Sequence, residues 1–135
     1  MDLTKNNGLN LKSEASEFFL FECEKDLHKI LEHAEAIEKK IQVIGSGTNT
    51  IFPRHFSNIV IKSSNNNFKF SEEGNVAKLE VGAGVIWDDL IDFCCSKNLH
   101  GLENLAGIPG TVGAAPIQNI GAYGVEISDL IDYVE

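Results

Sequence analysis

The segment from residue 104 to residue 125 constrains the fold of this chain more than any other part of the sequence. It contains no charged residue, five of the chain's 12 glycines and two of its three prolines. Proline cannot donate the backbone hydrogen bonds of a helix interior or a central strand, and glycine weakens both. We therefore predict an irregular loop. Long loops inside compact domains usually serve a function, and the lack of charge argues against disorder.

The composition of the 135-residue chain indicates one globular domain at most, with 43% hydrophobic and 23% charged residues. Eleven basic against 20 acidic residues give a net charge of −9. Nucleic acids and anionic membranes are bound largely through Lys and Arg clusters, so we expect neither as a partner. A small phosphorylated ligand stays compatible with this charge, because backbone N–H groups can hold phosphates.

The cysteines and histidines form no metal or redox motif. Cys94 and Cys95 are adjacent, no C-x-x-C occurs, and no two histidines have H-x-x-x-H spacing. We interpret these two cysteines and Cys23 as reduced packing residues, and we predict no metal site. The N-terminus has no apolar signal-peptide region, and no apolar run is long enough to span a bilayer. We therefore expect a cytoplasmic protein.

Hydrophobic periodicity predicts a strand–helix–strand unit in the first half. The aromatic and apolar run 18–21 predicts a buried strand, and the run 41–44 predicts another. Residues 59–61 predict a further strand. The apolar stripe of the intervening helix consists of Leu27, Ile30, Leu31, Ala34 and Ile37. This order suggests a βαβ unit with parallel strands.

The second half begins with two alternating segments, 68–70 and 76–81, which predict an antiparallel hairpin. A second helix follows, whose apolar face consists of Trp87, Leu90, Ile91 and Cys94. We interpret Trp87 as core, and the pair Asp88-Asp89 as a solvated helix start. Residues 130–135 predict a strand that is cut short.

The first candidate site is the run Gly45-Ser46-Gly47-Thr48-Asn49, directly after the strand 41–44. Glycines let backbone N–H groups converge on a phosphate, and the other three side chains add donors. The run is not a Rossmann fingerprint, because Thr50 stands where the third glycine belongs and Pro53 disfavours the following helix. A phosphate loop and a plain glycine-rich turn between strands remain equally supported.

The second candidate site is the uncharged segment itself. Its side-chain donors are Asn104, Thr111, Gln118, Asn119 and Tyr123, and its apolar walls would be Ile108, Val112, Ile117 and Ile120. This mixture suits a large, flat ligand with polar edges. A packed Ω-loop that serves only the fold is the alternative. The two segments together favour a dinucleotide cofactor such as FAD.

Residues 101–126 closely resemble the signature of the UDP-N-acetylenolpyruvoylglucosamine reductase family, and residues 43–52 resemble that family's pyrophosphate loop. The resemblance runs through nearly the whole chain, although the glycine-rich pentapeptide is shared by the wider vanillyl-alcohol-oxidase-like (PCMH-type) flavoproteins. It implies an α+β FAD-binding domain that is incomplete here, with a first part over 1–62, the start of a second over 63–135, and no substrate domain.

The resemblance also implies the site residues. Those holding the FAD pyrophosphate would be Gly45, Ser46, Gly47, Thr48 and Asn49. Those lining the flavin would be Gly110, Gly113, Ala114, Ala115, Ile117, Gln118 and Gly121. Tyr123 would lie close to flavin and substrate. The chain departs from the pattern at residues 7–10, where relatives often have Asn-Thr-Phe-Gly, and at alanines 114 and 115, where some carry serine.

The family's reaction is an FAD-dependent reduction in peptidoglycan synthesis, with NADPH as reductant and a UDP-sugar as substrate. Its Tyr-Arg arginine, its proton-donating serine and a late glutamate lie in a part of the family that this sequence does not include. We therefore expect no catalytic residue in this chain and no activity from it alone. Two alternatives stay open: another flavin oxidoreductase of the same superfamily, and a non-catalytic cofactor-binding module.

Overall fold

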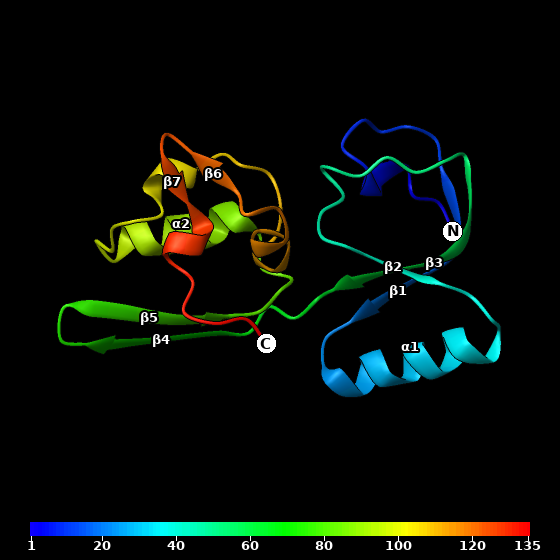
Figure 1. Cartoon of the computed structure of the whole chain (residues 1–135), viewed down its shortest axis with the longest axis horizontal. Helices are drawn as coiled ribbons and strands as arrows, with labels where there is room; N and C mark the ends of the chain where they lie inside the picture. Colours follow the sequence, from blue (N-terminus) through cyan, green and yellow to red (C-terminus); the bar gives the residue numbers. More distant parts are fainter. The chain divides into compact units, whose positions relative to one another are not determined.

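A computed structural model describes all 135 residues, which divide into two compact units, Met1–Asn65 and Asn66–Glu135 (Figure 1). The division falls after Asn65 rather than after Lys62, the predicted boundary. The reason is that strand β3 (His55–Ser63) continues past that boundary and pairs with β1 (Glu14–Phe21) through its last residue. The combination of helices and strands is α+β, as predicted.

The first unit is built on a three-stranded parallel sheet with the order β1–β3–β2, where β2 spans Ile41–Ile44. Helix α1 (Glu24–Ala36) connects β1 to β2, so the predicted βαβ unit is confirmed. The sequence did not predict that β3 lies between the two strands. Ile59, Val60 and Ile61 are at most 2% exposed, which shows that the central strand is covered on both faces.

Each face of that sheet has its own core. Helix α1 lies along one face (Figure 1). On that face, Ile59 and Ile61 pack against Ile30 and Ala34 of α1. On the other face, Val60 packs in a cluster supplied partly by loops, whose further members are Leu3, Ala15, Ile44 and Phe52. The N-terminal segment, through Leu3, and the segment after the glycine-rich run, through Phe52, therefore cover the sheet face opposite α1.

The predicted apolar stripe of α1 is wider than the buried face. Ile30 and Ala34 are buried, whereas Leu31 is 45% and Ile37 39% exposed. A small sheet covers only a narrow strip of the helix, which leaves the flanks of the stripe to solvent. The prediction of a buried first strand is also partly wrong, because β1 is an edge strand and Leu20, near its end, is 57% exposed.

The second unit begins with the predicted antiparallel hairpin, β4 (Phe68–Glu73) and β5 (Val76–Val81). Helix α2 (Trp87–Ser96) follows, and all four residues of its predicted apolar face are buried. They form one core with three residues of the following loop: Leu105, Ala115 and Ile127. Neither α1 nor α2 has the length and apolar character that a membrane-crossing helix needs.

The uncharged segment is irregular, as predicted. It contains short 3₁₀ turns and two strands of two residues each, β6 (Gly121–Ala122) and β7 (Val125–Glu126). The prediction of a strand over residues 130–135 is wrong, because these residues have no regular structure. A strand needs a neighbour for its backbone hydrogen bonds, and none of the seven strands pairs with this segment.

Candidate functional site

The glycine-rich run lies directly after β2, where the sequence predicts it, and forms a bend followed by a turn. Gly47 is buried and has a φ of +76°, a conformation that side chains rarely adopt. A Cβ atom at this position would overlap the carbonyl oxygen of Asn6. Glycine is therefore required at position 47 by the N-terminal segment, a reason that sequence reasoning missed.

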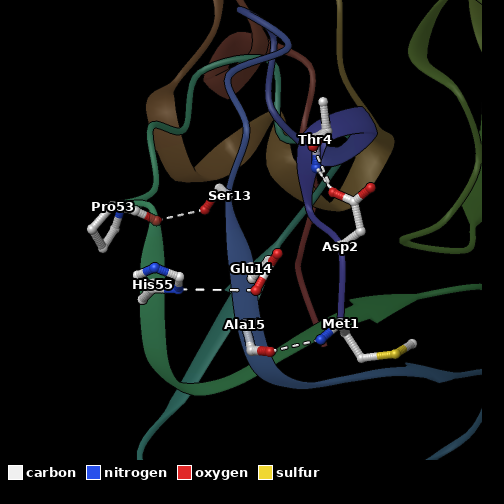
Figure 2. Close-up of polar contacts among 8 residues, drawn as sticks. All are labelled: Met1, Asp2, Thr4, Ser13, Glu14, Ala15, Pro53 and His55. Carbon is white, nitrogen blue, oxygen red and sulfur yellow. Dashed lines mark hydrogen bonds and ion pairs between the residues drawn. The ribbon is translucent and has the colours of Figure 1, made fainter.

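Backbone hydrogen bonds join the same two segments. The carbonyl oxygen of Gly47 accepts bonds from the N–H of Gly8 at 3.0 Å and from the N–H of Thr50 at 3.2 Å. The N-terminal segment is held in turn along the start of β1, where the N–H of Leu3 donates to the Ser13 carbonyl at 2.8 Å. The Ser13 hydroxyl donates to the Pro53 carbonyl at 2.6 Å (Figure 2). Ser13, directly before β1, therefore holds both the N-terminal segment and the segment that follows the glycine-rich run.

The chemistry of the glycine-rich run fits a phosphorylated anion. It offers two hydroxyls and one side-chain amide, and Thr48 and Asn49 are exposed. No carboxylate occurs from residue 45 to residue 53, although the chain as a whole carries a net charge of −9. This donor set favours a phosphate loop over a plain turn, whereas Gly47 alone supports either interpretation.

The uncharged segment is anchored to the start of α2. The indole Nε1 of Trp87 donates to the Leu105 carbonyl at 3.0 Å, and an oxygen of Asp88 accepts the Gly107 N–H at 2.8 Å. Trp87 is 2% exposed, which confirms its assignment to the core. The sequence predicts only a solvated helix start at Asp88, whereas in the structure its carboxylate also holds the loop at Gly107.

The predicted flavin-lining residues divide into internal and outward-facing ones. Ala115 is buried in the core, and Gly113 packs so closely on Ala83 that an added Cβ would lie 2.5 Å from the Ala83 Cβ. These two positions need small residues for packing. Gly110 and Ala114 are half-buried, and three residues are exposed: Ile117, Gln118 and Gly121.

Most of the residues predicted as apolar walls of the second candidate site belong instead to the hydrophobic core. Ile108, Val112 and Ile120 pack against the core of the second unit, whereas Ile117 is 84% exposed. The predicted donors are also partly used within the loop. Thr111 is 2% exposed, and the Asn119 amide donates to a Glu126 oxygen at 2.7 Å. In a helix or strand, the regular spacing of apolar residues indicates which side chains are buried. An irregular loop has no such spacing, so the sequence did not distinguish its buried residues from its exposed ones.

Tyr123 occupies the tip of the β6–β7 hairpin. Both loop residues have positive φ, 54° at Tyr123 and 82° at Gly124. Positive φ at both positions is typical of a type I′ turn, which favours Asn, Asp or Gly. A tyrosine there costs on the order of 1 kcal/mol. Its side chain is nevertheless 90% exposed, so the hairpin holds an aromatic ring out to solvent at some cost in stability.

The cysteines fit their predicted packing role only in part. Cys94 is buried, and that burial raises the pKa of its thiol, whereas Cys23 and Cys95 are exposed. All three are free. No three His, Cys, Asp or Glu side chains come together as a metal site would require.

Comparison with known proteins gives a matching domain family and similar relatives. The sequence model of the FAD binding domain matches residues 15–135. A UDP-N-acetylenolpyruvoylglucosamine reductase of Vibrio cholerae is 39% identical over 134 residues, 99% of this chain and 39% of the relative. The reductase of the same name from Shewanella baltica is 50% identical over 93 residues, 69% of this chain and 27% of the relative. The chain thus spans well under half the length of these relatives.

A solved structure has a similar fold. It is the UDP-N-acetylenolpyruvylglucosamine reductase of Thermus caldophilus, and the TM-score is 0.71 at 24% identity. The similarity covers 96% of this chain and 44% of that chain. At this level of identity the similarity is evidence for the fold, and it agrees with the expectation of a flavoprotein-type α+β domain.

Proposed function

The chain belongs to the FAD-binding domain family, and on that premise we propose that it is the FAD-binding portion of a UDP-N-acetylenolpyruvoylglucosamine reductase. The relatives carry that name, and this chain spans part of their length. The proposed reaction of the whole protein is the reduction of UDP-N-acetylenolpyruvoylglucosamine to UDP-N-acetylmuramate, with NADPH as reductant. We also propose that the protein acts in the cytoplasm, in peptidoglycan synthesis, a process on which cell shape and the cell cycle depend.

The observation that carries the proposal is the match of the FAD-binding domain over residues 15–135, which include both candidate segments. In the first unit, we assign the diphosphate of FAD to Gly45, Ser46, Gly47, Thr48 and Asn49. Two hydroxyls, an amide and backbone N–H groups are the donors that a diphosphate needs, and no carboxylate occurs from residue 45 to residue 53.

In the second unit, we assign the flavin ring to the segment from Gly110 to Gly121. Ile117, Gln118 and Gly121 would face it directly, and Gly110 and Ala114 would present backbone groups. Gly113 and Ala115 would shape this surface from behind, through their packing. An isoleucine that is 84% exposed gains most from a flat ligand that covers it. When bound, FAD supplies a ring that accepts a hydride and passes it on.

A titration of the purified chain with FAD and with riboflavin tests these assignments. Ser46→Ala removes a donor from the phosphate group and should weaken FAD binding while leaving riboflavin binding unchanged. Ile117→Asp should weaken both ligands. Val76→Asp, at an apolar residue that is 60% exposed in β5, is the matched control and should weaken neither. An unchanged chain that binds no FAD would contradict the proposal.

We further propose that the proton donor of the reaction lies outside these 135 residues. Ser46 belongs to the proposed phosphate group. Ser128 follows the Tyr123 hairpin, and the carboxylate next to it in sequence, that of Asp129, accepts the Glu126 N–H at 3.4 Å. Positioned proton transfer contributes about 10²–10⁴-fold to rates. The FAD-loaded chain should therefore show no substrate-dependent NADPH oxidation. Turnover close to that of a full-length relative would show that a catalytic group has been overlooked.

A further inference from the structure

Asn7 is a buried polar residue whose side chain makes four hydrogen bonds within one short loop. It is 4% exposed. Its Nδ2 group donates to the carbonyl oxygens of Leu3 and Leu11, both at 3.0 Å, and to that of Thr4 at 3.3 Å. Its Oδ1 atom accepts the Leu11 N–H at 2.9 Å. The side chain thus closes residues 3–11 into a fixed loop.

That loop lies against the glycine-rich run. On one side of Asn7, the Asn6 carbonyl meets the Cα of Gly47 so closely that no side chain fits there. On the other side, the Gly8 N–H donates to the Gly47 carbonyl at 3.0 Å. A Cβ on Gly8 would lie 2.6 Å from the carbonyl oxygen of Thr48. Both backbone neighbours of Asn7 therefore contact Gly47, and Gly8 also lies against Thr48.

We propose that Asn7 is a positioning residue for the FAD phosphate loop: its amide fixes residues 6–8, and these fix the backbone of Gly47 and Thr48. The inference rests on the proposed function for its link to FAD. A phosphate loop works through backbone N–H groups that must point to one place before the ligand arrives. The glycines that permit this geometry do not enforce it, so a neighbouring element must.

Only asparagine supplies what this position uses. The loop needs an acceptor for Leu11 and donors for the carbonyls around it, on one short side chain. Aspartate offers oxygens alone and would face those carbonyls with a negative charge. Alanine would remove all four hydrogen bonds from buried and partly buried backbone groups of residues 3, 4 and 11, which is costly.

The test compares Asn7→Ala with Ser13→Ala in the full chain. Ser13 is a matched control because it lies in the same unit, is 1% exposed, and loses one partly buried hydrogen bond, to Pro53, that does not involve residues 6–8. Hydrogen exchange of the Gly8 and Thr50 amides reports the loop directly, because both donate to the Gly47 carbonyl. The two variants are compared at temperatures that give equal stability.

We expect exchange at both amides to be about tenfold or more faster in Asn7→Ala than in Ser13→Ala, since local opening follows the lost bonds. We also expect FAD affinity to fall about tenfold relative to the control, with riboflavin affinity unchanged. Equal exchange in the two variants, or an equal loss of FAD affinity, would overturn the proposal. If the unchanged chain bound no FAD, the proposed function would fail, and the exchange rates would still decide whether Asn7 positions the loop.

Gly8→Ala is a second variant, in case Asn7→Ala does not fold. It leaves every bond of Asn7 in place and adds one methyl group against Thr48. Gly8 does not have a positive φ, so the substitution brings no backbone penalty there. We expect weaker FAD binding with riboflavin binding retained. Unchanged FAD affinity would show that the contact between the two loops does not matter for the cofactor.

Discussion

The indole Nε1 of Trp87 donates a hydrogen bond to the carbonyl oxygen of Leu105 at 3.0 Å, and both residues are buried. Trp87 begins α2, and Leu105 lies at the entrance of the uncharged segment. The next helix residue, Asp88, holds the Gly107 N–H at 2.8 Å. Two consecutive residues of α2 thus fix the course of a loop that has little regular structure of its own.

Trp87→Phe should destabilise the second unit. The substitution leaves the Leu105 carbonyl buried without its partner, which costs about 1–3 kcal/mol, and the smaller ring leaves a void. Urea denaturation followed by circular dichroism measures the change, because Trp87 is the chain's only tryptophan and its fluorescence is lost. Asp88→Asn, which keeps an oxygen acceptor for Gly107, is the control and should cost less. Equal free energies of unfolding for Trp87→Phe and the unchanged chain would contradict this prediction.

Tyr123→Asn should stabilise the β6–β7 hairpin. Asparagine tolerates the positive φ of 54° better than tyrosine, and the gain should be on the order of 0.5–1 kcal/mol. The ring itself makes little packing contact, since the side chain is 90% exposed. Thermal unfolding is the measurement, with Tyr123→Phe, which keeps the backbone penalty, as the control. A loss of stability in the asparagine variant would mean that the ring packs within the fold.

The two helices and the β4–β5 hairpin were predictable, because local hydrophobic spacing specifies each of them. The face of α2 is an example: four apolar residues at helical intervals are all buried. The strand order of the first unit was not predictable in this way. The residues 59–61 do not indicate whether their strand lies between β1 and β2 or at an edge of the sheet. Three consecutive apolar residues are only compatible with burial on both faces, which the structure shows.

The candidate site was predictable as segments and less well as individual contacts. Glycine and hydroxyl content drew attention to residues 45–49, but the partner of Gly47 is Asn6, about forty residues earlier, and no local pattern connects them. The same holds for Ile108, which an irregular loop turns inward, and Ile117, which it leaves exposed. The roles of the site residues toward FAD stay predictions.

The three cysteines should differ in reactivity. Burial raises the pKa of the Cys94 thiol and blocks access to it, whereas Cys23 and Cys95 are exposed. Iodoacetamide at neutral pH should label Cys23 and Cys95 in the folded chain, with Cys94 at least about tenfold slower. Tandem mass spectrometry separates the adjacent pair, and denatured chain provides the control. Similar rates for Cys94 and Cys95 in folded protein would contradict the buried position of Cys94.

The pKa of Glu103 should be low in the folded chain. Backbone hydrogen bonds from its own N–H and from the Gly101 N–H lower the pKa below the ordinary 4.5, and His100 lies 3.5 Å away. Because the folded pKa is depressed, this carboxylate's stabilising contribution is complete above pH 4.5 and is lost as the pH falls through the lower folded value. The Gly101 amide shift should titrate with a midpoint below 4.5, and Glu103→Gln should abolish that titration. A midpoint at pH 4.5 or above would contradict the predicted lowering of the Glu103 pKa.

Gly47→Ala should destabilise the first unit even without FAD. Two costs add at this position: a positive φ of +76°, and overlap of the new Cβ with the Asn6 carbonyl. Gly74→Ala separates them, because Gly74 has a φ of +66° and nothing within 4 Å of an added Cβ. The control should lose only the conformational term, about 1 kcal/mol, whereas Gly47→Ala should lose about 1–3 kcal/mol more, as overpacking does. Chemical denaturation of the FAD-free variants provides both numbers. Equal losses of unfolding free energy in the two variants would mean that the N-terminal segment shifts to admit the methyl group at little cost. A larger loss in Gly47→Ala would mean that weaker FAD binding by a Gly47 variant cannot by itself be assigned to the phosphates.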